Sequence, residues 1–234
     1  MIVLGFDTAT PATAVGLLDG AAPDDVRERR HEPAEGERPG HAAQLLALAH
    51  ELLDAAGIGF ADVDRIGVGL GPGTFTGLRI GVATARALAQ AAGAELAGVS
   101  TLRALVAAAE PEAPSGAGVL AVVDARRGEV FAAGWRDGEQ VLDSVALAPG
   151  ALADRLRARG ETWLAVGDGA LRFRSDLEGA GCLVAPDRSP YHGVAAGMIC
   201  RLALEAPQAA ARDLVVPDYL RPPDASRPRT SSAT

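Results

Sequence analysis

The chain has 234 residues, and 48% of them are hydrophobic, so it can bury a sizeable core and is not an intrinsically disordered protein. It carries 22 basic and 30 acidic side chains, and this net charge of −8 disfavours a protein that binds nucleic acid mainly through its own phosphate contacts. Every basic residue is arginine. The absence of lysine excludes enzymes that depend on a Walker-type lysine, a Schiff-base lysine or the strand lysine of kinases.

The first half of the chain alternates short apolar strands with helices. Strands are predicted at residues 2–7, 13–18, 26–31, 65–70 and 96–99. Helices are predicted at 41–56, 75–92 and 101–109, and the first two end at Gly57 and Gly93. Residues 110–118 combine Pro, Gly and acidic side chains, which is typical of a linker. We therefore expect an N-terminal α/β lobe over residues 1–110.

The second half repeats this alternation. It predicts strands at 119–124, 129–135, 141–145, 162–166 and 182–184, a helix between Pro149 and Gly160, a short helix after Gly169, and a last helix at 191–205. These elements form an expected C-terminal α/β lobe at 111–221, followed by a tail at 222–234 whose composition predicts disorder. No apolar run is long enough to span a membrane, and Cys182 and Cys200 lie far apart. We expect a soluble cytoplasmic protein with reduced core thiols.

Three loops have residues that can hold a phosphate. The first begins with Asp7 and Thr8, the second contains Gly71, Gly73 and Thr74 before a long helix, and the third contains Gly167 and Gly169. Free backbone N–H groups at a helix start attract anions, and glycine lets a phosphate approach closely. The same residues are also typical of tight turns, and their spacing alone favours that interpretation. The three loops together are only weak evidence for a nucleotide cleft between the two lobes.

Six segments resemble the TsaB (YeaZ) family: FDTA at 6–9, GPGTFTGLRIG at 71–81, GVSTL at 98–102, DARRGEVF at 124–131, VGDGA at 166–170 and PDYLR at 217–221. The resemblance implies the two-lobed fold of the actin, sugar-kinase and Hsp70-like ATPases (ASKHA), with mixed sheets flanked by helices. It also implies a subunit of the bacterial complex that forms N6-threonylcarbamoyladenosine at adenosine 37 of tRNAs reading codons that begin with A. The implied partners are the catalytic paralogue TsaD, in a heterodimer, and the ATPase TsaE, through the complex.

One departure from TsaD bears on catalysis. TsaD holds its metal with a His-x-x-x-His pair, and the matching positions here are Thr101 and Leu105. Leucine has no ligand atom and a lone threonine hydroxyl is a poor ligand, so we expect no metal site and no catalytic residue. The resemblance then implies a non-catalytic subunit that requires no cofactor of its own, with ATP and Mg²⁺ bound elsewhere in the complex, and with the three loops as vestiges of a nucleotide site.

Two helices have more apolar surface than one core-facing stripe needs. Such a surplus marks either a helix enclosed in a large domain or a partner site, and the family resemblance favours the partner site. The predicted interface consists of Leu45, Leu46, Ala49 and Leu53 on the first helix and Leu78, Val82 and Ala85 on the second. The same faces would also allow a homodimer of the isolated chain.

A different class of function stays open at this point. An independent ATP-dependent phosphotransferase or hydrolase of the same superfamily could use Asp7 and the glycine loops, but no convincing general base accompanies Asp7. The arginine clusters at residues 27–30, 155–159 and 221–229 are interleaved with acids or lie in a flexible end. They are typical of solvated surfaces, so we expect tRNA to be contacted only indirectly or in an auxiliary way.

Overall fold

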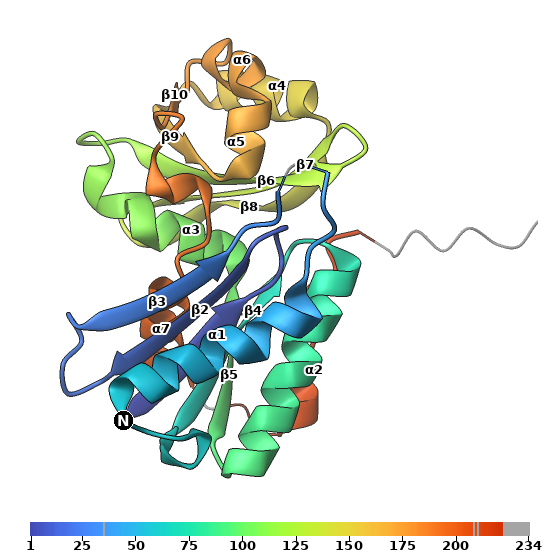
Figure 1. Ribbon diagram of the computed structural model, residues 1–234. Coiled ribbons are helices and arrows are strands. Elements are labelled where there is room, and N and C mark those ends of the chain that lie inside the picture. Colours follow the sequence, from blue (N-terminus) through green and yellow to red (C-terminus); the bar gives the residue numbers. More distant parts are fainter. Residues whose placement is uncertain (35, 208, 210, 222–234) are drawn as a thin grey trace, which may run out of the picture.

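The computed structural model describes residues 1–34, 36–207, 209 and 211–221, and the tail predicted at 222–234 lies outside the described residues. Two five-stranded mixed sheets lie one above the other, each flanked by helices (Figure 1). The strands are β1 (Ile2–Asp7), β2 (Thr13–Asp19), β3 (Val26–His31), β4 (Arg65–Gly71), β5 (Glu95–Ser100), β6 (Gly118–Arg126), β7 (Glu129–Arg136), β8 (Glu139–Leu147), β9 (Trp163–Val166) and β10 (Leu183–Val184). The helices are α1 (His41–Ala56), α2 (Phe75–Ala92), α3 (Thr101–Ala109), α4 (Pro149–Arg159), α5 (Asp168–Arg172), α6 (Arg174–Glu178) and α7 (Ala196–Glu205).

The first sheet has the order β3-β2-β1-β4-β5. The pairs β1–β2 and β2–β3 are antiparallel, whereas β1–β4 and β4–β5 are parallel. Helices α1 and α2 lie side by side on one face of this sheet (Figure 1). Their inward side chains, such as Leu52 and Val82, share one core with Phe6, Ile66 and Val68 of the strands. The αL residues Gly57 and Gly93 end the two helices where the sequence predicted.

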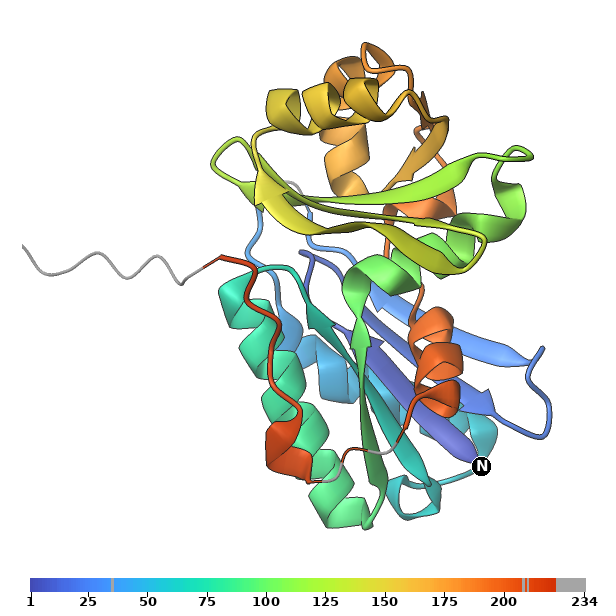
Figure 2. The ribbon, with the colours of Figure 1, turned by 180° about the vertical axis from the view of Figure 1, so that it is seen from behind.

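The second sheet repeats the order of the first as β8-β7-β6-β9-β10. Its outer face is covered by α4 and α6, and the fully buried Trp163 lies in that core with Leu152, Leu156 and Leu177. Helix α3 occupies the space between the two sheets (Figures 1 and 2) and contributes Leu102 and Leu105 to a core shared with β6 and α7. The predicted fold class, two α/β units with mixed sheets flanked by helices, is confirmed.

Helix α7 follows the second sheet in the chain but packs on the first, against β1, β2 and β4. A Cβ atom on Gly5 would lie 2.7 Å from Cys200 Sγ, and one on Gly67 would lie 2.6 Å from the Cβ of Ala203. Glycines in the strands therefore let α7 approach the sheet closely. The helix predicted at 191–205 begins later, since Pro190–His192 form a 3-10 turn and Gly193 is extended. The expected grouping of 111–221 into one lobe separates α7 from the sheet that it covers, because residue order does not reveal this return of the chain.

The C-terminal strap, which we define as residues 211–221, runs along α2 toward the second sheet (Figure 2). Val215 is buried in the α2 core, and Arg86 Nε donates a hydrogen bond to its carbonyl oxygen at 3.0 Å. Asp218 N donates to Leu70 O at 2.8 Å, and Arg221 Nη1 donates to Glu129 Oε2 at 2.5 Å. The strap thus connects α2 and β4 of the first sheet to β7 of the second.

Two sequence expectations concern the environment of the chain. Cys182 and Cys200 are buried free thiols, as predicted, and burial raises the pKa of Cys182 to about 11 and that of Cys200 to about 12. Both therefore stay protonated at neutral pH. Within the described residues, no helix combines the length and the apolar character that crossing a bilayer requires.

Candidate functional site

Two of the three predicted loops meet at the carboxyl end of the first sheet. The turn after β1 carries Asp7 and Thr8, and the turn after β4 carries Gly71, Gly73 and Thr74 before α2 begins. Thr8 Oγ1 donates a hydrogen bond to Gly77 O at 2.8 Å, and Thr74 N donates to Ala9 O at 2.7 Å. The loops therefore bond directly to each other, at the place where a phosphate group would need open backbone amides.

Glycines in the second loop and in the adjoining β4 and α2 allow this close contact. A Cβ atom on Gly73 would lie 2.3 Å from Ala9 O, and one on Gly77 would lie 2.0 Å from Thr8 O. A Cβ atom on Gly69 would lie 1.9 Å from Asp7 Oδ2. Each of these distances is below any real Cβ contact, so only glycine fits. The glycine pattern is thus explained by loop-to-loop packing.

Asp7 lies beneath this junction and is 1% exposed. Its Oδ1 accepts a hydrogen bond from Ala9 N at 2.8 Å, and its Oδ2 accepts one from Thr101 Oγ1 at 2.6 Å. Thr101 Oγ1 in turn accepts from Gly71 N at 3.2 Å. Burial raises the pKa of Asp7, and the bonds from Thr101 and Ala9 oppose that shift only in part. Asp7 is therefore a buried link between β1, β4 and α3.

Thr101 and Leu105 are the two positions that the sequence analysis matched to a metal-binding pair. Thr101 is fully buried and bonded to Asp7, whereas Leu105 is 1% exposed within the core between the sheets. In the part of the chain that the structure describes, no cluster of three or more His, Cys, Asp and Glu side chains is placed to hold a metal ion. The two positions act here as parts of the hydrogen-bond network and of the core.

The third loop, at the start of α5, packs on β6 in a similar manner. A Cβ atom on Gly167 would lie 2.2 Å from Val122 O, which leaves no space for a side chain. Gly167 also has a φ of 100°, a backbone conformation that favours glycine. A Cβ atom on Gly169 would lie 2.8 Å from the carbonyl carbon of Val123. Asp168, between them, accepts a hydrogen bond from Asp124 N at 3.0 Å, and burial raises the pKa of its carboxyl group.

Two hollows flank these loops. A groove of about 620 Å³ lies between the β1–β2 turn, β3 and residues 187–195, and Asp168 borders it. Two charged side chains of this groove are engaged within the chain: Glu28 Oε1 accepts from Gly197 N at 2.7 Å, and Arg30 Nη1 donates to Val194 O at 2.9 Å. A smaller hollow of about 190 Å³ is bordered by Gly73 and Thr74. Among the seven predicted loop residues, these two border the smaller hollow. The larger groove is bordered by neighbours of the other residues, namely Thr10, Pro11 and Ala12 of the first loop and Asp168 of the third.

The predicted interface residues lie mostly in the core of the chain itself. Leu45, Ala49, Leu53, Leu78, Val82 and Ala85 are between 0 and 4% exposed, and they hold α1 and α2 on the first sheet. Leu46 is 43% exposed. The six buried side chains are not available on the surface, contrary to the expectation that they contact a partner, because the sheet beneath is wide enough to cover them. Whether α1 and α2 pair with another protein stays a prediction.

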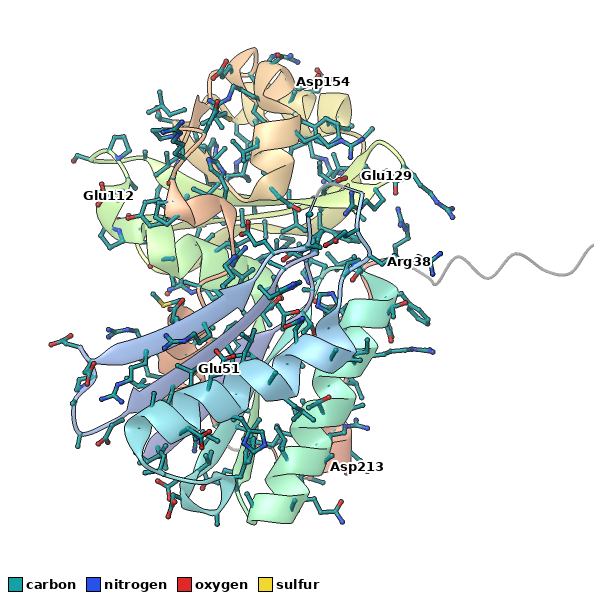
Figure 3. The ribbon with its side chains drawn as sticks, viewed as in Figure 1. Arg38, Glu51, Glu112, Glu129, Asp154 and Asp213 are labelled. Atoms are coloured by element: carbon teal, nitrogen blue, oxygen red, sulfur yellow. The ribbon has the colours of Figure 1, made fainter. Side chains whose placement is uncertain are left out.

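The outward faces of α1 and α2 hold, besides the predicted Leu46, exposed residues that the sequence analysis did not assign to the interface. The small exposed residues are Ala42, Ala43 and Ala47 beside Leu46 on α1, and Thr76, Ala83, Ala87 and Ala91 on α2. Glu51 marks the outward side of α1 in Figure 3. The signal that could have found this face is the recurrence of alanine at three- and four-residue steps on the side of each helix opposite the leucines.

Comparison with known proteins places the chain in a family. The model of the family described as "TsaD: tRNA N6-adenosine threonylcarbamoyltransferase" matches residues 33–157. The protein named "tRNA threonylcarbamoyladenosine biosynthesis protein TsaB" of Escherichia coli is 31% identical over 175 residues, which cover 72% of each chain. The structure of YeaZ from Pseudomonas aeruginosa has a TM-score of 0.70 and 27% identity, covering 93% of this chain and 100% of that chain. The chain belongs to the TsaB family.

Membership agrees with the architecture described above. A hexokinase of the ROK type from Thermus thermophilus shares the fold of this TsaB-family chain, with a TM-score of 0.52 at 14% identity, and covers 87% of this chain and 100% of that chain. The resemblance recognised from the six sequence segments is thus confirmed, as is the ASKHA fold class. The TsaB family shares the two-sheet plan of sugar kinases, but in this chain the loops at the first sheet are closed by glycine packing.

Proposed function

We propose that this chain is a non-catalytic scaffold subunit of the complex that forms N6-threonylcarbamoyladenosine at adenosine 37 of tRNA, and that it pairs with the catalytic paralogue TsaD. The family, with its E. coli relative named for the biosynthesis of this modified nucleoside, supports the pathway. The observation that carries the non-catalytic role is the junction of the first two loops. Thr74 N, at the start of α2, is engaged by the carbonyl oxygen of Ala9, and the carbonyl oxygens of Ala9 and Thr8 lie against Gly73 and Gly77.

The pairing surface in this proposal is the outward face of α1 and α2. Its alanines would let the helices of a partner approach closely, as small residues do in packed bundles. Leu46 is the large apolar side chain exposed at its centre, and it stands between Ala42, Ala43 and Ala47. The isolated chain would pair through the same face as a homodimer, because an orphan apolar face can meet its own copy across a two-fold axis.

Replacing Leu46 by Asp tests this surface. A carboxylate there would have to lose water on pairing, so we expect the affinity for TsaD to fall at least about 30-fold, as for a central hot-spot residue. Leu183→Asp is the matched control, since Leu183 is 49% exposed and lies on β10 of the second sheet. The measurement is co-purification and calorimetric titration of the two chains, with a thermal melt to confirm folding. If folded Leu46→Asp binds TsaD as well as Leu183→Asp does, the proposed surface is wrong.

A calorimetric titration of the isolated chain with ATP and Mg²⁺ separates this proposal from the phosphotransferase or hydrolase alternative. The closed loops predict no turnover of ATP. Binding accompanied by release of phosphate would overturn the scaffold proposal in favour of the enzyme.

A further inference from the structure

An exposed cluster of aromatic and arginine side chains lies where the strap crosses the start of α2. The rings of Phe75 and Tyr219 have centroids 5.3 Å apart and are tilted by 35°. The guanidinium carbon of Arg79 lies 3.8 Å from the Phe75 ring centroid, and Arg79 Nε donates to Tyr219 Oη at 3.2 Å. These three residues, which we call the Phe75 cluster, come from segments 140 positions apart.

The cluster is held in place by the strap. Val215 is anchored in the core four residues before Tyr219, and Asp218 N bonds to Leu70 O directly before it. Arg86 Nη2 donates to Asp213 O at 2.6 Å, near the foot of α2 where Figure 3 labels Asp213. Tyr219 nevertheless stays 39% exposed. A rigid, exposed and half-stacked aromatic side chain has no role in the fold core, and it costs little entropy when it binds a ligand.

Phe75 and Tyr219 of the cluster form one wall of the 190 Å³ hollow, and Arg79 lies over the Phe75 ring. The opposite wall comes from the second sheet, where Phe131, Asp124 and Arg126 line the cavity, and Arg221 closes one side. The hollow thus joins flat aromatic faces to charged groups, and one planar ring with an attached anionic group is of suitable size for it. Figure 3 shows Glu129 and Arg38 on this side of the molecule.

The charged side chains that line this hollow are balanced in number, in a chain whose net charge is −8. Arg126 and Arg221 line it together with Asp124 and Asp218. Beside it, Arg79 lies over the Phe75 ring, Arg172 pairs with Asp124, and Glu129 pairs with Arg221. The Asp124 side chain is only 7% exposed and pairs with Arg126 and Arg172, so its charge is turned inward. Arg126 and Arg127 both have left-handed φ values, 63° and 54°, at the tip of the β6–β7 turn. The side chains of Arg126 and Arg172 are thus about half exposed, at 54% and 53%, above the buried Asp124 carboxylate.

We propose that the Phe75 cluster and its hollow are a docking site for a single-stranded segment of RNA. An unpaired base would stack on the Tyr219 and Arg79 planes, and the neighbouring arginines would face the backbone phosphates. An acidic peptide would satisfy the arginines but would leave the aromatic planes unused, and a duplex keeps its bases stacked internally. This is a direct RNA contact, whereas the sequence predicted only an indirect one. The site does not depend on the pairing surface of α1 and α2.

The test is fluorescence anisotropy of a labelled twelve-nucleotide oligoadenylate titrated with the full chain. Tyr219→Ala and Arg79→Ala should each weaken binding about tenfold, the effect of losing one stacked base, whereas Tyr219→Phe keeps the ring and should lose less. Arg155→Ala is the matched control, because Arg155 is an exposed arginine on α4, and it should change the affinity less than twofold. Circular dichroism checks that the variants fold.

Several results would overturn the proposal. The wild-type chain failing to bind the oligonucleotide would do so, and so would an equal loss in Arg155→Ala. Heparin, a polyanion without bases, should compete poorly, and equal competition by heparin would show charge attraction without stacking. If Tyr219→Ala weakens pairing with TsaD and leaves RNA binding unchanged, the cluster belongs to a protein interface instead. Leu46→Asp should bind RNA normally, which separates failure of this proposal from failure of the proposed pairing.

Discussion

In each sheet an aspartate near the end of the central strand accepts a hydrogen bond from the backbone amide two residues later. Asp7 Oδ1 accepts from Ala9 N at 2.8 Å, and Asp124 Oδ1 accepts from Arg126 N at 2.9 Å. The sheets also share one strand order. The partners of the two carboxylates differ, since Asp7 is bonded to the neutral Thr101, whereas Asp124 is paired with Arg126 and Arg172.

The same local arrangement, an aspartate at the end of the central strand, therefore has different surroundings in the two sheets. At the first sheet, glycines and a buried hydroxyl bring two loops into direct contact. At the second sheet, the aspartate holds arginines at the rim of a hollow that opens to solvent. The first sheet thus ends in a packed junction of two loops, whereas the second ends in half-exposed arginines beside the hollow.

The largest effect is expected for Gly77→Ala, at the junction of the first two loops. Alanine normally stabilises a helix relative to glycine, but here its Cβ would lie 2.0 Å from Thr8 O, a backbone atom that cannot move alone. We expect the free energy of unfolding to fall by about 3 kcal/mol, as in an overpacked core. Gly150→Ala is the control, since Gly150 lies in the first turn of α4 with nothing within 4 Å of a Cβ. It should stabilise by up to about 1 kcal/mol. Urea unfolding of both variants measures the contrast, and a Gly77→Ala as stable as Gly150→Ala would contradict the closed junction.

The contrast between Leu45 and Leu46 shows how far the sequence alone could lead. The apolar pattern predicted α1 and its ends correctly, yet these adjacent leucines are 1% and 43% exposed. Periodicity measures how wide an apolar stripe is and not what covers it, so core and partner residues on α1 could not be told apart. Likewise the loop glycines were recognised, but their purpose depends on how close Thr8 and Ala9 lie, and that is a property of the fold.

The positions of α7 and of the strap could not be predicted either, because they depend on contacts between distant parts of the chain. Helix α7 and the strap both return to the first sheet after the second is complete, and no local pattern encodes such a return. Tyr219 and Phe75 meet only because of the strap. The site at the Phe75 cluster therefore required the tertiary structure, although Arg126 and Arg127 belong to one of the six segments that carried the family resemblance.

A smaller effect is expected for Thr101→Val, which keeps the shape of the side chain and removes the hydroxyl. It leaves Gly71 N without its acceptor and Asp7 Oδ2 without its donor, so unfolding should become easier by about 1–3 kcal/mol.

The pH dependence of the stability lost in Thr101→Val tests whether the Thr101 hydroxyl is bonded to the Asp7 carboxyl group. Because burial raises the pKa of Asp7 above its ordinary value of 3.8, the folded state binds the proton more tightly than the unfolded state. The contribution of Asp7 to stability is therefore greatest at low pH and falls as the pH rises from 3.8 through the folded pKa. The hydroxyl of Thr101 favours the charged carboxylate, so its removal raises that pKa further. The difference between wild type and Thr101→Val should be larger at pH 8 than at pH 4, measured by urea unfolding at each pH. A difference that shrinks with rising pH would contradict the assigned bond.

The smallest loss of stability is expected for Arg172→Ala, beside Asp124 of the second sheet. Its Nη1 lies 2.8 Å from Asp124 Oδ2, yet the arginine side chain is 53% exposed, and water and salt screen such a pair. Asp124 also keeps Arg126 as a partner at 3.4 Å, so its carboxylate is not left alone. We expect a loss below about 1 kcal/mol that disappears in high salt, whereas the loss in Thr101→Val should persist there, because a buried hydroxyl bond is not screened. Unfolding of both variants at low and high ionic strength checks this. A large, salt-independent loss in Arg172→Ala would mean that Asp124, like Asp7, is a structural link, and that the two sheet ends differ less than their partners indicate.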